Sequence, residues 1–252
     1  MKKTLSLIVA SLLCIFSFGQ FETQFIFTGK ITFERKTNVH RLYFTESEMD
    51  SWDEMFKKAM PQFQVNYFEL LFGENKSLYR QTPDQPEAKM GWFGDAPGSK
   101  NIVFKDFATQ KSVSQKQIFE SQFLLKDSLN EYEWKLQPET RTIAGFECKK
   151  AITKICDSVV VVAFYTEEIV STSGPESFGG LPGVILGLAV PRLYTTWFAT
   201  KVELLKDADV VKIAAPTKGK GSTSTQMLST IDQAINDWGK KYRDRSVWFA
   251  SL

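Results

Sequence analysis

The stretch IAGFECKKAITKICDSVVVVAFY, residues 143–165, decides the fold class of this chain. It contains two runs rich in β-branched and aromatic residues, 143–155 and 159–165, and such runs are typical of strands. Cys156 and Asp157 lie between the runs and predict a tight reversal. Two strands joined by so short a connection pair antiparallel, so the stretch predicts a β-hairpin.

Further strand patterns lie on both sides of this hairpin. Residues 25–33 alternate apolar and polar side chains, and residues 65–81 predict a second hairpin with its turn at residues 73–76. The other predicted strands are residues 102–107, 116–126, 132–136, 184–190 and 194–205. Short connections without crossover helices favour an antiparallel meander. We therefore predict a mainly β (α+β) fold, built on a curved antiparallel sheet or half-barrel meander.

Two amphipathic helices are expected to pack against this sheet. The first covers residues 45–60 and ends at Pro61, which cannot continue a helix. The second covers about residues 224–243 and has an apolar stripe at helical spacing. That stripe consists of Met227, Leu228, Ile231, Ala234, Ile235 and Trp238.

The first residues have the pattern of a secretory signal peptide. Lys2 and Lys3 precede a nearly continuous apolar run that ends at Phe18. This run of about 14 residues is shorter than the roughly 20 that a membrane-spanning helix needs. We expect cleavage of residues 1–19, which leaves one domain over residues 20–252. We also expect export to the periplasm, or peripheral association with the outer membrane, with no transmembrane segment after cleavage.

The charge of the chain excludes one class of partner. Lysine and arginine number 31 and aspartate and glutamate number 29, for a net charge of +2. Loss of Lys2 and Lys3 leaves a nearly neutral domain. Nucleic-acid binding requires a concentrated basic face, so we expect no nucleic-acid partner.

Cys148 and Cys156 are the two cysteines that remain after cleavage. On one extended strand, eight residues place them roughly 26 Å apart, whereas bridged Cα atoms lie within about 7 Å. A Cys148–Cys156 disulfide therefore requires the chain to turn back between them. We expect two free thiols instead.

A block of motifs resembles the GLPGLI family of bacterial envelope proteins. Residues 174–186, GPESFGGLPGVIL, contain the motif that names the family, with Val184 in place of a leucine. Residues 117–127, QIFESQFLLKD, and parts of residues 134–169 are similar to the core of the same family. The resemblance implies an exported protein of unknown function and brings no catalytic residues with it.

The long connection over residues 82–101 is the first candidate for binding. Connections of this length without secondary structure are uncommon unless they serve as lids or binding loops. Trp92 and Phe93 lie in it between two glycines and can form an aromatic tip that covers a groove or docks a partner. Alternatively, both rings tuck under the loop as an extension of the core.

The glycine-rich segment is the second candidate for binding. Gly179, Gly180 and Gly183 allow the backbone to approach a ligand closely. The alternative is structural, because Pro182 and Gly183 fit the two central positions of a type II turn that leads into a buried strand. We favour the structural interpretation.

The sequence contains no recognised catalytic or cofactor motif. His40 is the only histidine, and no H-x-x-x-H, C-x-x-C or G-x-S-x-G pattern occurs. Residues 218–223, KGKGST, lack the spacing of a phosphate-binding loop and predict a flexible linker. We therefore predict no catalytic residue, no metal and no cofactor.

These observations predict an exported, non-catalytic envelope protein of the GLPGLI family. Its partner is an envelope protein or an apolar small molecule, held in a groove of the phenylalanine-rich sheet. The alternative is an envelope hydrolase with an unrecognised site, in which Cys148 or His40 meets carboxylates in a polar pocket. Its oligomeric state stays open.

Overall fold

The structure of this protein is a computed structural model. It describes five stretches of the chain, residues 25–44, 51–73, 75–83, 98–205 and 213–252. The expected signal peptide over residues 1–19 lies outside the described residues, as do Trp92 and Phe93.

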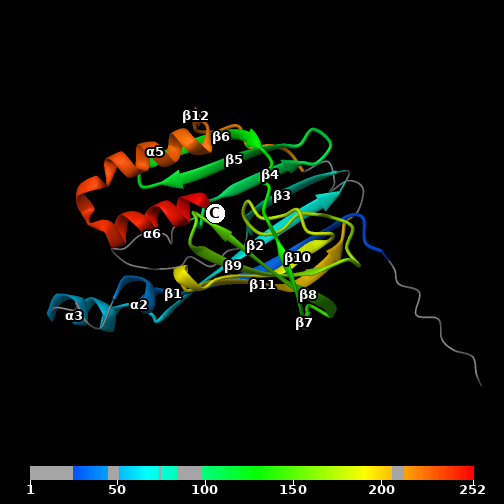
Figure 1. Ribbon diagram of the computed structural model, residues 1–252, viewed down its shortest axis with the longest axis horizontal. Coiled ribbons are helices and arrows are strands. Elements are labelled where there is room, and N and C mark those ends of the chain that lie inside the picture. Colours follow the sequence, from blue (N-terminus) through cyan, green and yellow to red (C-terminus); the bar gives the residue numbers. More distant parts are fainter. Residues whose placement is uncertain (1–24, 45–50, 74, 84–97, 206–212) are drawn as a thin grey trace, which may run out of the picture.

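One open, mixed sheet of 12 strands forms the body of the described part of the protein (Figure 1). Its strand order is β12-β6-β5-β4-β3-β2-β1-β11-β10-β9-β8-β7, and every pair is antiparallel except β12 with β6. The strands are β1 (Gly29–Asn38), β2 (Phe63–Gly73), β3 (Lys76–Gln81), β4 (Ile102–Asp106), β5 (Lys111–Ile118), β6 (Ser121–Ser128), β7 (Lys135–Ile143), β8 (Phe146–Ile155), β9 (Val159–Thr166), β10 (Val184–Val190), β11 (Thr195–Leu204) and β12 (Lys220–Ser222). The helices are α2 (Val39–Tyr43), α3 (Ser51–Ala59), η2 (Pro191–Leu193), α5 (Ser224–Ala234), η3 (Asn236–Trp238) and α6 (Lys240–Ser251). The mainly β fold with packed helices is confirmed.

The hairpin predicted from residues 143–165 is present as β8 and β9. Ile155 pairs with Val159, and the two strands stay in register back to Lys149 and Tyr165. The turn spans residues 156–158, and two of its three residues have positive φ, 47° at Cys156 and 60° at Asp157. A three-residue connection of this kind is a common hairpin loop.

Three local predictions for the strands are wrong. The expected strand over residues 116–126 is two strands, β5 and β6, because the chain reverses at Phe119 with φ 51°. Strand β7 extends past Pro138, which is tolerated because β7 is an edge strand with an irregular register between Gln137 and Thr140. Within the expected flexible linker, Lys220–Ser222 pairs with β6 as β12.

The helices also differ from the prediction. Helix α3 contains no buried residue, so its stripe does not pack on the sheet as expected. Residues 45–50 of the predicted first helix lie outside the described residues. The predicted second helix is two helices, α5 and α6, separated by η3 and by Gly239 with φ 80°. No helix in the described stretches is both long and apolar enough to cross a membrane.

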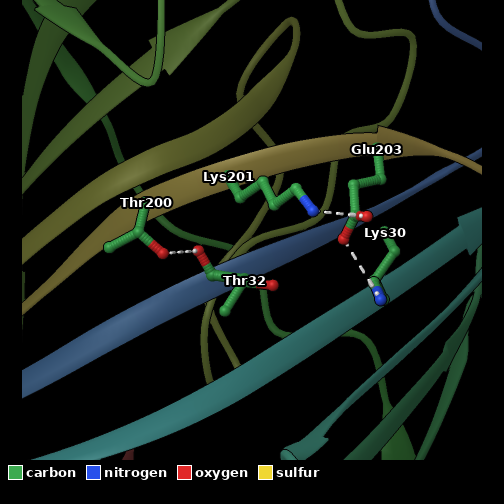
Figure 2. Close-up of polar contacts among 5 residues, drawn as sticks. All are labelled: Lys30, Thr32, Thr200, Lys201 and Glu203. Atoms are coloured by element: carbon green, nitrogen blue, oxygen red, sulfur yellow. Dashed lines mark hydrogen bonds and ion pairs between the residues drawn. The ribbon is translucent and has the colours of Figure 1, made fainter.

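The pairing of β1 with β11 contains a bulge at the middle of the sheet. Thr32 pairs with Lys201 and Phe33 with Ala199, so Thr200 is the extra residue. The Thr200 hydroxyl donates a hydrogen bond of 3.1 Å to the Thr32 carbonyl, as Figure 2 shows. This bond gives a partner to a backbone oxygen beside the irregular part of the ladder. On the same strands, Glu203 forms exposed ion pairs with Lys30 and Lys201.

The main hydrophobic core lies against the central strands. It combines strand residues such as Phe33, Phe68 and Leu188 with Phe178 from the connection between β9 and β10. A second cluster joins β6 to α5 and α6 through Phe123, Leu125, Met227, Ile231, Ile235 and Ala250. Met227, Leu228, Ile231 and Ile235 of the predicted stripe therefore pack on this part of the sheet, and Figure 1 shows α5 beside β5 and β6.

Candidate functional site

The glycine-rich segment, residues 171–183, folds over the sheet instead of opening to a ligand. Gly183 is buried against the backbone of β9, where an added Cβ would lie 2.0 Å from the Thr166 carbonyl oxygen. Gly179 is similarly close to the Thr172 carbonyl oxygen. The predicted type II turn at Pro182 and Gly183 is wrong, because Gly183 does not have the positive φ that this turn requires, whereas Gly180 has φ 81°. These glycines are required by close packing within the chain.

Glu176 attaches this segment to the sheet through a buried polar network. The side-chain amide of Asn101 donates a hydrogen bond of 2.9 Å to the Glu176 carboxylate. The Arg35 guanidinium lies 3.9 Å from the other carboxylate oxygen, and its ring neighbours are Phe68 and Trp197. Glu176 and Arg35 are each 1% exposed. Loss of any partner of this buried ion pair should destabilise the fold, because a buried charge without a partner has a large desolvation penalty.

Two buried lysines complete this network. The Lys105 ammonium donates hydrogen bonds to the carbonyl oxygens of Gly174 and Phe178 in the segment. Burial lowers the pKa of Lys105 to about 7, although the nearby Glu176 carboxylate acts in the opposite direction. The Lys116 ammonium donates a hydrogen bond of 2.9 Å to the Ala250 carbonyl in α6. Because these groups are almost completely buried, the network positions the segment and α6 and does not face a substrate.

An open cleft of about 430 Å³ lies where α2, η2 and α6 meet. Its volume falls within the range of roughly 300–1,000 Å³ that small-ligand sites occupy. Figure 1 shows these three elements at the same end of the sheet. The lining residues are Arg41, Leu42, Arg192, Tyr194, Lys240, Asp244, Arg245 and Trp248.

Aromatic rings hold the two central arginines of the cleft in place. The Arg245 guanidinium lies 4.7 Å from the Tyr43 ring and 4.9 Å from the Tyr242 ring. It also donates a hydrogen bond of 2.6 Å to the Leu42 carbonyl oxygen, which connects α6 to α2. Burial lowers the pKa of Arg245, although an arginine keeps its charge at neutral pH.

The second arginine of the cleft, Arg192, lies on η2. Its guanidinium is 5.2 Å from the Trp248 ring and donates a hydrogen bond of 3.1 Å to the Ser158 hydroxyl. Tyr194 follows η2 with φ 48° and is 43% exposed, so its ring is accessible from solvent. The cleft therefore combines fixed cations with aromatic surface, which suits a ligand with both polar and apolar faces.

The side chains considered for a hydrolase do not come together. The ring nitrogen Nε2 of His40 hydrogen-bonds the Met60 carbonyl oxygen at 2.9 Å. Cys148 is buried, and burial raises its pKa to about 12, which keeps it a thiol at neutral pH. Cys156 is exposed at the β8–β9 turn, and both cysteines are free. In the described stretches, no group of three or more histidine, cysteine, aspartate or glutamate residues is arranged to bind a metal.

The sequence analysis did not single out any residue of the cleft. Its lining residues come from three short elements that are far apart in the chain. The one local pattern that points to the cleft is KKYRDRSVW, residues 240–248, which combines four basic residues with Tyr242 and Trp248. The predicted second helix ended at residue 243, so half of this pattern was not assigned to a helix face.

Comparisons with known proteins identify one family and one fold. The family described as "N-glycanase peptide, N-terminal domain" matches residues 100–229, just over half of the 252 residues. A structure of PNGF-II in space group C2 has a TM-score of 0.52 and 15% identity, and the similarity covers 88% of this chain and 33% of that chain. A structure of PNGF-II in space group P21 has a TM-score of 0.51 and 16% identity, covering 79% and 32%. No curated protein sequence matches this chain.

These comparisons correct two predictions. The assignment to the GLPGLI family is wrong, because the family that matches is the N-glycanase one and the similar structures are those of PNGF-II. The prediction of a non-catalytic envelope protein is wrong for the same reason. The alternative prediction of a hydrolase agrees better with the family that matches. At 15–16% identity the structural likeness shows the fold alone. This chain also spans about a third of the length of PNGF-II.

Proposed function

This chain belongs to the family described as "N-glycanase peptide, N-terminal domain". We therefore propose that it takes part in the hydrolytic release of N-linked glycans from glycoproteins. The match of the family over residues 100–229 carries this proposal. Within it, we assign the cleft between α2, η2 and α6 to the binding of the glycan. In this cleft, aromatic and charged side chains line one hollow, and the Tyr194 ring is accessible from solvent.

The chemistry of the cleft fits a saccharide. One face of a sugar ring presents C–H groups, which pack on an aromatic ring such as that of Tyr194 or Trp248. The hydroxyl groups around the ring need polar partners, and the arginines offer N–H donors while the Asp244 carboxylate offers acceptors. Arginines already fixed by neighbouring rings lose little conformational freedom when a ligand binds, which favours affinity.

Removing the Tyr194 ring tests this assignment. Tyr194→Ala should weaken oligosaccharide binding on the order of tenfold, which corresponds to about 1.4 kcal/mol, because an exposed aromatic platform is lost. Calorimetric titration with an N-glycan oligosaccharide gives the affinity, and the mass loss of a glycoprotein gives the hydrolytic activity. Trp52→Ala is the matched control, since Trp52 is 65% exposed on α3 and does not line the cleft.

Two results would contradict the proposal. Equal loss of affinity in Tyr194→Ala and Trp52→Ala would remove the cleft from glycan binding. Absence of both oligosaccharide binding and glycoprotein deglycosylation in the wild-type protein would reject the function itself. Both variants should keep the thermal unfolding midpoint of the wild type, because each exposed side chain adds little to the core.

A further inference from the structure

We propose that the cleft selects glycans that carry an anionic group, a carboxylate or a sulfate, on a sugar ring. This inference rests on the proposed function, because it names the class of glycan that the same cleft prefers. It is carried by the charges that line the cleft and by how their side chains are held.

Cations outnumber anions among the residues that line the cleft. Four of the eight lining residues are basic, namely Arg41, Arg192, Lys240 and Arg245, and Asp244 is the single acid. Over the whole chain the two signs nearly balance, 31 against 29. A concave surface with an excess of one sign concentrates its electrostatic field and attracts ligands of the opposite sign.

In the part of the chain that the structure describes, the cations of the cleft have no carboxylate partner of their own. Some surface lysines, such as Lys30, Lys149 and Lys150, each form an ion pair with a glutamate. Among the described residues, none of the four cleft cations forms an ion pair. Their charge is therefore not neutralised by a carboxylate of this part of the chain.

The two arginines are held by contacts within the chain and keep N–H donors that suit a planar or tetrahedral oxyanion. Each guanidinium is packed on aromatic rings and uses one N–H group to bind an oxygen of the chain, Ser158 Oγ for Arg192 and the Leu42 carbonyl for Arg245. A guanidinium has five N–H donors, so others remain for a ligand. Paired donors on a fixed guanidinium bind carboxylates and sulfates with two hydrogen bonds, which a lysine does not do.

The aromatic surface distinguishes an acidic sugar from a free anion. Tyr194 and Trp248 offer apolar faces next to the guanidinium groups. A small inorganic anion would use only the cations, whereas an acidic sugar also packs its ring on the aromatic side chains. We therefore expect both parts of the ligand to contribute to affinity.

Matched oligosaccharides test the inference in the wild-type protein. A sialylated N-glycan and the same glycan after removal of its sialic acids are compared by calorimetric titration, together with a sulfated N-glycan and with inorganic sulfate. The sialylated or the sulfated glycan should bind at least tenfold more tightly than the neutral glycan, and the two acidic glycans show which oxyanion is preferred. The preference should shrink as ionic strength rises, because the interaction is between opposite charges. Inorganic sulfate should bind more weakly than either.

Variants then locate the preference in the cleft. Arg192→Gln should weaken binding of the acidic glycan on the order of tenfold more than binding of the neutral glycan, because only the acidic glycan loses a charge-assisted hydrogen bond as well as an N–H donor. Arg192→Lys keeps the charge but not the paired donors, so it should recover only part of the preference. Lys126→Gln makes the same charge change at an exposed position of β6 and should behave as the wild type. Thermal unfolding of each variant checks that it is folded.

The outcomes separate the inference from the proposed function. Equal affinity for acidic and neutral glycans would overturn the inference and leave the proposed function intact. Binding of inorganic sulfate as tightly as the sulfated glycan would also overturn it, because the sugar would then contribute nothing. An unchanged preference in Arg192→Gln would place acidic selectivity elsewhere and overturn the assignment to this cleft. If no glycan binds and no glycoprotein is deglycosylated, both proposals fail.

Discussion

Gly183 is the residue of the glycine-rich segment whose replacement should cost the most stability. In Gly183→Ala, the new Cβ would lie 2.0 Å from the carbonyl oxygen and 2.6 Å from the carbonyl carbon of Thr166, and 3.0 Å from the Cα of Glu167. All three atoms belong to the backbone, so no side chain can rotate to make room. Relief requires β9 and β10 to separate where Val184 pairs with Thr166.

We expect Gly183→Ala to lower the free energy of unfolding by about 3 kcal/mol, the upper part of the range for overpacked interiors. For a domain of this size, such a loss lowers the thermal midpoint by roughly 6–12 °C. Chemical denaturation of wild type and variant measures the difference directly.

Two other glycines give matched controls for this clash. Gly180→Ala meets no atom within 4 Å but has φ 81°, so it should cost about 1–2 kcal/mol from backbone strain alone. Gly221→Ala also meets no atom within 4 Å and needs no positive φ, so it should be nearly neutral. If Gly183→Ala unfolds within about 0.5 kcal/mol of the wild type, or if it costs no more than Gly180→Ala, the reasoning from close packing is wrong.

Two further predictions concern titratable groups. Lys105 has a pKa of about 7 in the folded protein and about 10.4 when unfolded, so the folded state binds fewer protons between these values and its stability rises with pH. From pH 7.5 to 9.5, the free energy of unfolding of the wild type should therefore rise by on the order of 2 kcal/mol more than that of Lys105→Met. If the free energies of unfolding of the two proteins change in parallel over this pH range, the prediction is wrong. Iodoacetamide at pH 8 should modify exposed Cys156 and not Cys148, whose pKa burial raises to about 12; peptide mapping that finds Cys148 modified in the folded protein would contradict its burial.

The sequence predicted the elements whose pattern is local. The hairpin of β8 and β9 follows from two strand-forming runs and the short polar turn between them, all within 23 residues. The apolar stripe around Met227 and Ile231 follows from helical spacing and does pack on the sheet. In both cases, the residues that decide the structure are neighbours in the chain, so their spacing alone is informative.

Other features depend on contacts that no local pattern contains. Gly183 looked like a turn residue because a proline precedes it, but its role is set by the Thr166 backbone on the preceding strand. No local pattern singled out Glu176, because its amide partner Asn101 is 75 positions away. The helix over residues 51–59 has a clear apolar stripe and buries none of it, since amphipathic spacing does not supply a surface to pack against.

The buried network and the cleft are connected through α6. The Lys116 ammonium binds the Ala250 carbonyl and the Ser177 amide binds the Leu252 carbonyl, so the last turn of α6 is attached to the sheet and to the glycine-rich segment. Earlier in the same helix, Arg245 binds the Leu42 carbonyl on α2 and Trp248 packs beside Arg192. A change that displaces the segment therefore acts on the helix that supplies half of the cleft lining. The positions of the cleft groups on α6 therefore depend on buried residues, such as Lys116, that do not line the cleft.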